Sequence, residues 1–296
     1  MPPLDAGAAP AERLYRRLQT AFDAPLGDIP ATVVTFFKKD TPPPRGLLQF
    51  TPDSETVMCC QAVRHAAGGE PVLLTSETIG CIAAGISLGL LDQDDPRPAA
   101  PPRHYTEMMR RQAAHPDFTP PSPRQFTDGQ VYACHQAGRP EFGLFGPGDS
   151  GRFATPAVAR KAIAGMAAIQ PAVMAAVLFT PVGFTAVPLA PDVVVLAVRP
   201  VVLSRILQGY QYLTGKSVHA VMHPVRAVDS DLIARPYLTG DINVSPYCLG
   251  ARLVARYGGD LMGIGIPFAV FSQIVDGMEQ SRSGYPFSRY PGALGA

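Results

Sequence analysis

The chain contains no tryptophan, few cysteines and no excess of either charge. Its 25 basic and 24 acidic residues give a net charge of +1, without the basic stripe that marks a nucleic-acid surface. No apolar run reaches the roughly 18 residues of a membrane-spanning helix, and the N-terminus lacks a basic segment followed by an apolar one. The sequence therefore predicts a cytoplasmic protein that binds neither nucleic acid nor membrane.

The cysteines are too few for a disulfide scaffold, and their number, five, is odd. In a cytosolic chain such thiols favour metal or redox chemistry over disulfides. Three of them, Cys60, Cys81 and Cys248, each lie beside Gly, Pro or the end of a predicted element, where a thiolate can point into a cavity. Three thiolates from separate parts of a chain suit a metal centre with one open coordination position. The alternative is that they are small buried hydrophobic residues, a common role of free Cys.

Two regular regions flank an irregular one. Prolines crowd 96–102 and 120–123, and glycines punctuate 138–151. A segment of this kind predicts a connector or lid over 92–153, between an N-terminal α/β half at 1–91 and a C-terminal α/β half at 154–296. Outside the connector, we expect helices at 12–22, 54–67, 81–91, 157–169, 200–213 and 267–278, and strands at 31–37, 71–75, 173–179, 193–198, 217–222, 253–257 and 261–266.

The two regular regions resemble each other. Pro30-Ala-Thr-Val-Val-Thr-Phe-Phe parallels Pro191-Asp-Val-Val-Val-Leu-Ala-Val, and the segment from Gln61 parallels the segment from Gln208. Internal similarity points to duplication. The predicted fold is therefore α/β, an internally duplicated α/β unit with a Pro/Gly-rich insertion. Its site would lie at the seam between the halves, where Cys60 and Cys81 could meet Cys248.

Other residues could act beside the thiols. Cys60 and Cys81 lie near predicted helix starts, where the helix dipole lowers a thiol pKa. Glu77 is a candidate acid or base, or alternatively a cap for the helix that follows. Arg252 could hold negative charge near Cys248.

Two histidines, His219 and His223, would share one face of a strand and could bind a metal together. Pro224 follows at once and favours ordinary packing or surface exposure instead. Cys59 should point away from its neighbour Cys60 and belong to the core, and Cys134 should be dispensable.

The segment Cys60-Gln-Ala-Val, with Glu77, Cys81 and Leu88-Gly-Leu, resembles the first block of the domain-of-unknown-function family numbered 169, the ArCR group. The second block resembles the stretch that starts at Pro191-Asp-Val-Val-Val and ends at Cys248-Leu-Gly-Ala-Arg252. The resemblance spans about residues 30 to 290. It implies that the three cysteines belong to recurring motifs, which favours metal or iron–sulfur ligation.

The family pattern also includes a further cysteine near 227–232, where this chain has Val228-Asp-Ser-Asp-Leu. The resemblance therefore implies either three Cys ligands or a carboxylate, from Asp229 or Asp231, in that place.

These observations lead to three hypotheses. The first is an enzyme, a lyase or oxidoreductase, with a 4Fe–4S cluster on Cys60, Cys81 and Cys248; Glu77 or Asp229 would be the acid or base. The second is a Zn enzyme on the same cysteines, or one with a cysteine nucleophile. The third is a sensor that binds a tetrapyrrole or another aromatic ligand against Tyr210, Tyr237 and Met262. The expected partner is a small-molecule substrate, while a homo-oligomer and an electron-transfer partner stay open.

Overall fold

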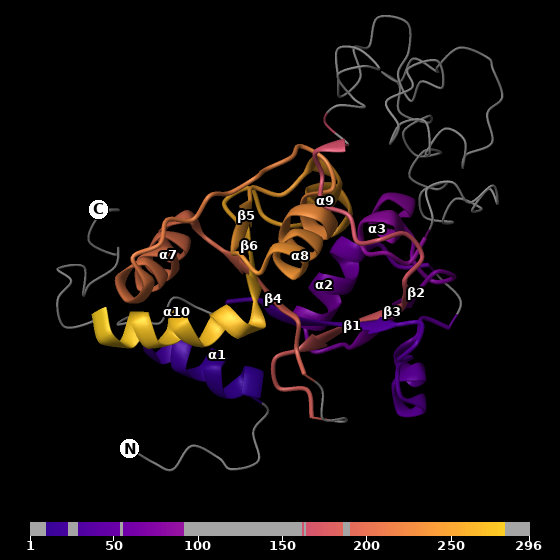
Figure 1. Cartoon of the computed structure of the whole chain (residues 1–296), viewed down its shortest axis with the longest axis horizontal. Coiled ribbons are helices and arrows are strands. Elements are labelled where there is room, and N and C mark those ends of the chain that lie inside the picture. Colours follow the sequence, from indigo (N-terminus) through magenta and orange to yellow (C-terminus); the bar gives the residue numbers. More distant parts are fainter. Residues whose placement is uncertain are drawn as a thin grey trace, which may run out of the picture.

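A six-stranded antiparallel sheet with helices on both faces forms the centre of the protein (Figure 1). The computed structural model describes residues 10–22, 29–53, 56–91, 162, 164–185 and 190–281. The strands lie in the order β2-β3-β1-β4-β6-β5, and every neighbouring pair is antiparallel. They are β1 (Ala31–Lys38), β2 (Val72–Thr75), β3 (Met174–Pro181), β4 (Val193–Val198), β5 (Asn243–Ser245) and β6 (Met262–Pro267). The predicted α/β class is confirmed.

The helices form two layers. One face of the sheet carries α2 (Cys59–Ala67), α3 (Ile82–Ser87), the π-helix η3 (Ala227–Ala234), α8 (Arg235–Thr239) and α9 (Leu249–Val254). The other face carries α1 (Pro10–Thr20), α7 (Pro200–Thr214), α10 (Phe268–Gln280) and the 3-10 helix η1 (Arg45–Phe50). None of the helices in the described ranges combines the length and the apolar character needed to cross a bilayer.

Strand β4 shows why the chain needs both layers. Its residues alternate between two hydrophobic cores: Val193 and Val195 pack beneath α2 and η3, whereas Val194 and Leu196 pack beneath α7 and α10. Successive side chains of a strand point to opposite faces of the sheet. An uninterrupted run of apolar residues, such as β4, therefore requires cover on both sides.

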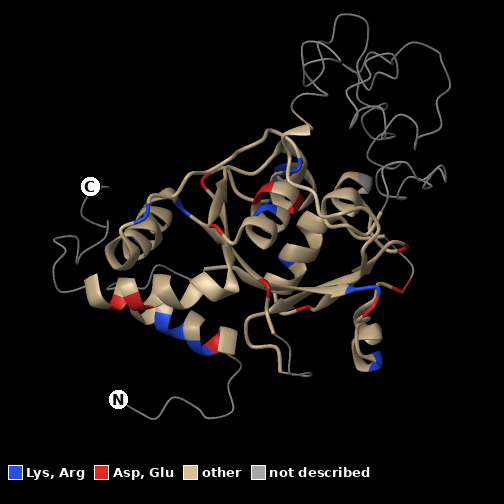
Figure 2. Cartoon of the chain, viewed as in Figure 1, with Lys and Arg blue, Asp and Glu red and all other residues tan. Residues whose placement is uncertain are grey.

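The outer helices α1 and α10 are joined by an ion-pair cluster. Arg17 of α1 lies 2.6 Å from Asp276 and 2.6 Å from Glu279 of α10, and Figure 2 shows basic residues of α1 beside acidic residues of α10. Both carboxylates raise the pKa of Arg17 through hydrogen bonds and charge attraction. The two ends of the described chain are thereby held in one layer.

The strand order reads symmetrically about the β1–β4 pair. Moving outward, β1 is followed by β3 and β2, and β4 is followed by β6 and β5. The first three strands of the chain thus occupy places equivalent to those of the last three. The predicted division of the chain at the connector, 92–153, falls outside the described residues and stays a prediction.

Several predicted elements are wrong. Residues 217–222 form no strand, and the predicted strand 253–257 is replaced by helix α9 and the loop after it. The sequence also matched α2 with α7, yet α2 packs in one core and α7 in the core on the opposite face of the sheet. These two helices are therefore not equivalent.

Candidate functional site

The helices α2 and α3 begin side by side. Val57, three residues before Cys60, and Ile79, two residues before Cys81, form a parallel bridge. The N–H of Val57 donates to the carbonyl of Thr78 at 2.9 Å, and the N–H of Gly80 donates to the carbonyl of Val57 at 2.8 Å. This bridge places Cys60, in the first turn of α2, near Cys81, which precedes α3 as its N-cap.

The third cysteine approaches on α9. Cys248 is the N-cap of that helix, and its Sγ accepts the N–H of Ala251 at 3.4 Å. The far end of α9 is tied to α2, since the Arg64 guanidinium donates to the carbonyls of Ala255 at 2.8 Å and Arg256 at 2.7 Å. Three helix starts, of α2, α3 and α9, therefore carry the three cysteines to one core.

Asp229 reaches the same core from the first turn of η3. Its side chain is buried, and burial raises its pKa, although the charge of Arg226 and the nearby Ser87 hydroxyl partly oppose the shift. Its Oδ2 and the Ser87 Oγ nevertheless make no hydrogen bond of normal geometry. The π-helix is a rare conformation that is frequent at functional sites.

The thiols interact electrostatically. Burial raises the pKa of Cys60 well above its ordinary value, and charge on Cys81, Cys248 and Asp229 raises it further. Burial and the same neighbours also raise the pKa of Cys59. This direction is opposite to the lowering expected at a helix start, because desolvation of the thiolate is the largest cause and the backbone N–H of Gln61 opposes it only in part.

Several polar groups in this core are unsatisfied. Within the described ranges, the buried side-chain oxygens without a hydrogen-bond partner belong to Ser87, Asp229, Ser230 and Tyr247. A buried polar group without a partner costs about 1–3 kcal/mol, so the neighbouring Ser87 and Asp229 call for an explanation such as an ion or ligand. In the part of the chain that the structure describes, no three His, Cys, Asp or Glu side chains already stand in a metal-binding arrangement. Ligation would therefore require side-chain rotation.

The backbone around the site is strained. Arg226, Tyr247 and Arg256 have positive φ angles of 57°, 64° and 56°, which non-glycine residues seldom adopt. They directly precede η3, Cys248 and Tyr257. Strained residues gather at functional sites, where the surrounding structure holds them in place.

Two tyrosines form one wall of this region. The rings of Tyr247 and Tyr257 stack with centroids 4.2 Å apart, and burial raises the pKa of both phenols. The Tyr257 hydroxyl donates to the carbonyl of Cys60 at 3.5 Å. The aromatic wall therefore adjoins the buried Cys60, whereas Cys81 and Cys248 are half-buried.

Two other predicted site residues have different surroundings. Glu77 is exposed in the turn between β2 and α3, and α3 begins without a side-chain cap. Arg252 donates to the carbonyls of Pro246 (2.5 Å), Leu261 (3.3 Å) and Gly258. Its guanidinium thus braces the loops on either side of α9.

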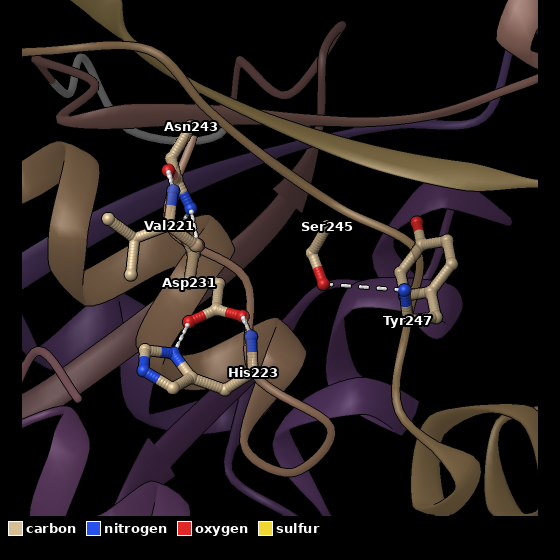
Figure 3. A network of polar contacts seen from close by, with 6 residues as sticks. All are labelled: Val221, His223, Asp231, Asn243, Ser245 and Tyr247. Atoms are coloured by element: carbon tan, nitrogen blue, oxygen red, sulfur yellow. Dashed lines mark hydrogen bonds and ion pairs between the residues drawn. The ribbon is translucent and has the colours of Figure 1, made fainter. Parts of the chain in front are cut away.

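A second polar network is centred on Asp231 of η3 (Figure 3). Asp231 accepts hydrogen bonds from the backbone N–H of His223 at 2.8 Å and from its Nδ1 at 2.7 Å. The Asn243 amide holds the arrangement by bonding to Val221 and to the carbonyl of Asp231. An Nδ1–H bonded to a carboxylate leaves Nε2 as the basic nitrogen. His219, expected beside His223, is exposed.

Asp231 should make stability depend on pH. Burial raises its pKa to about 6 despite the opposing His223 hydrogen bonds, and its side chain is 1% exposed. Because an unfolded Asp has a pKa of about 3.9, the folded state holds the proton more tightly. The stabilisation is complete below pH ~4 and is lost as pH rises through 6, by about 3 kcal/mol in total.

Urea unfolding of the metal-free protein between pH 4 and 7 measures this loss. We expect the unfolding free energy of Asp231→Asn to fall by about 3 kcal/mol less than that of the wild type over this pH range. Equal slopes for the two proteins would contradict the assignment.

Comparison with protein families gives one match. The pattern of the DUF169 family, described as uncharacterised ArCR, covers residues 30–277. The chain belongs to the DUF169 family. No curated protein and no solved structure matches it. The DUF169 match includes the three predicted cysteine ligands, so the resemblance inferred from the sequence is confirmed.

Sequence reasoning missed three features of this DUF169 protein. These are the π-helix, the Tyr247–Tyr257 stack and the His223–Asp231 pair. The Val228-Asp-Ser-Asp-Leu stretch mixes polar and apolar residues without a helical period. A signal was nevertheless present, because apolar residues flank the two aspartates on both sides, as expected of a buried segment.

Proposed function

We propose that the protein is an enzyme with an iron–sulfur centre, a 4Fe–4S cluster held by Cys60, Cys81 and Cys248, that acts on a small organic substrate. The observation that carries the proposal is the convergence of three cysteine-bearing helix starts on one buried core. Cytosolic thiols gathered in this way are more typical of metal sites than of disulfides, and the four cysteines in the described ranges are free.

The chemistry of the donor set fits such a group. Besides burial, negative charge on Cys81, Cys248 and Asp229 raises the pKa of Cys60, so the ionised forms of these groups disfavour its thiolate. A bound cation would reverse that relation by favouring the thiolates. Soft thiolates select iron–sulfur clusters or zinc over the harder divalent cations.

A cluster with one open iron position would supply Lewis-acid or redox chemistry. Around it, the stacked Tyr247 and Tyr257 exclude water, and Arg252 fixes the loop that leads to Cys248. Glu77, Asp229 and Arg252 stay candidates for proton transfer and substrate binding. His223 joins them, because Asp231 orients its ring.

The proposal includes a cytoplasmic location, since reducing conditions keep thiols available for a metal. A redox reaction would add an electron-transfer partner, whereas Lewis-acid chemistry would need only the substrate.

Anaerobic purification tests the proposal. We expect brown protein with iron and acid-labile sulfide at about four each per chain, the composition of one 4Fe–4S cluster, and thiolate-to-iron absorption bands. Protein that stays colourless and free of iron after reconstitution with iron and sulfide would refute the cluster.

The second candidate is a single zinc on the same cysteines. Zinc at one equivalent per chain without iron would support it. The raised pKa of Cys60 disfavours the remaining nucleophile hypothesis for metal-free protein, because the thiolate is the nucleophilic form. The tetrapyrrole hypothesis loses its expected pocket, since Tyr210 packs on one face of the sheet and Tyr237 against the core of the other.

A further inference from the structure

The contact between His223 and Asp231 decides which ring nitrogen of the histidine carries the proton. The carboxylate of Asp231 accepts the backbone N–H of His223 through Oδ2 at 2.8 Å and bonds to Nδ1 through Oδ1 at 2.7 Å. An ionised carboxylate can only accept hydrogen bonds, so Nδ1 is the nitrogen that carries the proton. The contact thereby selects the tautomer in which Nε2 is the basic nitrogen.

Both partners are held by Asn243 of β5. The two ends of its amide bond to the backbone N–H and carbonyl of Val221, at 2.8 and 2.9 Å, two residues before His223. The same Nδ2 donates to the carbonyl of Asp231 at 2.9 Å. The imidazole and the carboxylate are therefore positioned from one strand of the sheet, and neither has to reorganise before a proton moves.

The pair is closed on the carboxylate side and open on the imidazole side. The side chain of Asp231 is 1% exposed and that of His223 is 14% exposed. Figure 3 shows the second ring nitrogen at the outer end of the ring, directed away from Asp231, Ser245 and Tyr247. Within the described ranges Nε2 has no hydrogen-bond partner. Because it is not one of the buried side-chain atoms that lack a partner, Nε2 lies at the surface.

A purely structural link between these residues would not need a charge. An asparagine in place of Asp231 could accept the same backbone N–H and donate to Nδ1. Burial of the carboxyl raises its pKa to about 6, so the ionised form destabilises the fold at neutral pH. Groups whose pKa is perturbed in this way are concentrated at functional sites.

The protein contains a similar pair in a different environment. Nδ1 of His65 lies 2.8 Å from Oε2 of Glu70, but these side chains are 49% and 74% exposed. Water competes for both groups, and exposed pairs of this kind contribute little energy. The His65–Glu70 contact is therefore an internal control for the buried pair.

We propose that His223 and Asp231 form a proton-transfer dyad that activates a hydroxyl group of a small organic substrate. The O–H bond breaks, its electron pair stays on the oxygen, and the proton forms a new bond to Nε2. The Asp231 carboxylate stabilises the imidazolium without taking the proton, and the imidazolium then returns the proton to the product. His223 is the catalytic residue and Asp231 the positioning residue.

The surroundings of the ring suit an organic substrate. Met222 and Pro224, on either side of His223 in the chain, are both exposed and offer apolar surface to its carbon skeleton. This inference goes beyond the proposed metal centre and does not depend on it, because the dyad contains none of the three cysteines.

Diethyl pyrocarbonate acylates an unprotonated imidazole nitrogen and tests the dyad in the full-length protein. The reaction is run at pH ~8, above the ordinary His pKa of ~6.5, and peptide mass spectrometry gives the rate for each histidine. In Asp231→Asn the amide donates to Nδ1, which moves the ring proton to Nε2. We expect His223 to react at least ~10-fold more slowly in this variant, a small part of the ~10⁴-fold loss that a wrong tautomer causes in a Ser-His-Asp triad.

The matched control is Glu70→Gln. It should change the acylation rate of His65 by no more than about twofold, because the surface pair is weak. The exposed His219 should react at the same rate in every variant. Circular dichroism checks that Asp231→Asn is folded, as expected of a substitution that can keep both contacts.

Nitrogen NMR of the wild-type protein gives a second measurement that needs no variant. The chemical shifts of the two ring nitrogens identify the protonated one, and we expect it to be Nδ1 in neutral His223. Protonation on Nε2, or equal acylation rates of His223 in the wild type and Asp231→Asn, would overturn the proposal. Neither readout involves iron or zinc, so failure of the dyad and failure of the metal centre are separate results.

Discussion

Replacing Cys60, Cys81 or Cys248 with serine should each reduce bound metal to less than about a tenth of the wild-type content. A serine differs little in size from cysteine but ligates iron and zinc poorly, because its hydroxyl is hard and stays protonated. The loss of a ligand should also exceed the ~10–100-fold affinity cost of losing an outer-shell partner. Metal analysis of desalted protein measures the effect.

Two cysteines serve as controls. Cys59→Ser changes a buried neighbour on α2 that the sequence assigns to the core, and Cys134→Ser changes the connector, outside the described residues. Both should keep the metal. If Cys134→Ser strips the metal while Cys248→Ser leaves it in place, the ligand assignment is wrong and the connector belongs to the active site.

Gly265→Ala should destabilise the fold by about 3 kcal/mol, near the upper end of the usual range for overpacking. Gly265 lies in β6 directly beneath η3, and a Cβ there would overlap the carbonyl oxygen of Leu232 and approach its carbonyl carbon at 2.7 Å. Backbone cannot yield as a flexible side chain can. The π-helix, and Asp229 with it, would have to move away from the sheet.

Thermal unfolding of metal-free protein measures the loss, which corresponds to a midpoint lower by about 6–12 °C for a domain of this size. Gly259→Ala is the matched control, because a Cβ at Gly259 meets nothing within 4 Å. It should change stability by no more than about 0.5 kcal/mol. Equal midpoints for the two variants would show that η3 does not depend on the glycine for its position.

The strands and long helices could be predicted because their patterns are local. The β-branched runs of β1 and β4 favour a strand in any tertiary context. Helix α7 begins with Pro200 and ends before Gly215. The strand predicted at 217–222 was wrong because that prediction, too, used the local pattern alone. The segment has strand-like residues, but Asn243 bonds to its backbone and holds Val221 in a loop.

The site was only partly predictable. The sequence predicted that Cys60 and Cys81 lie near helix starts and that Cys248 meets them. The sequence could not predict which helices share a face of the sheet, because the order of the strands decides that. Sequence similarity alone matched α2 with α7, because both are amphipathic helices ending near glycine, and so the role of η3 stayed hidden.

The central place of β1 has a consequence for biosynthesis. Thr35 pairs with Leu178 on one side, and Val33 pairs with Val194 on the other. The first strand to leave the ribosome therefore waits for chain made much later, a delay on the order of ten seconds at ~5–20 residues per second. During that interval its backbone edges are unpaired and its apolar side chains uncovered, as for any strand with distant partners. The nascent first half is thus exposed to aggregation until its partners are made, and the proposed centre on Cys60, Cys81 and Cys248 would form only after the C-terminal half has left the ribosome.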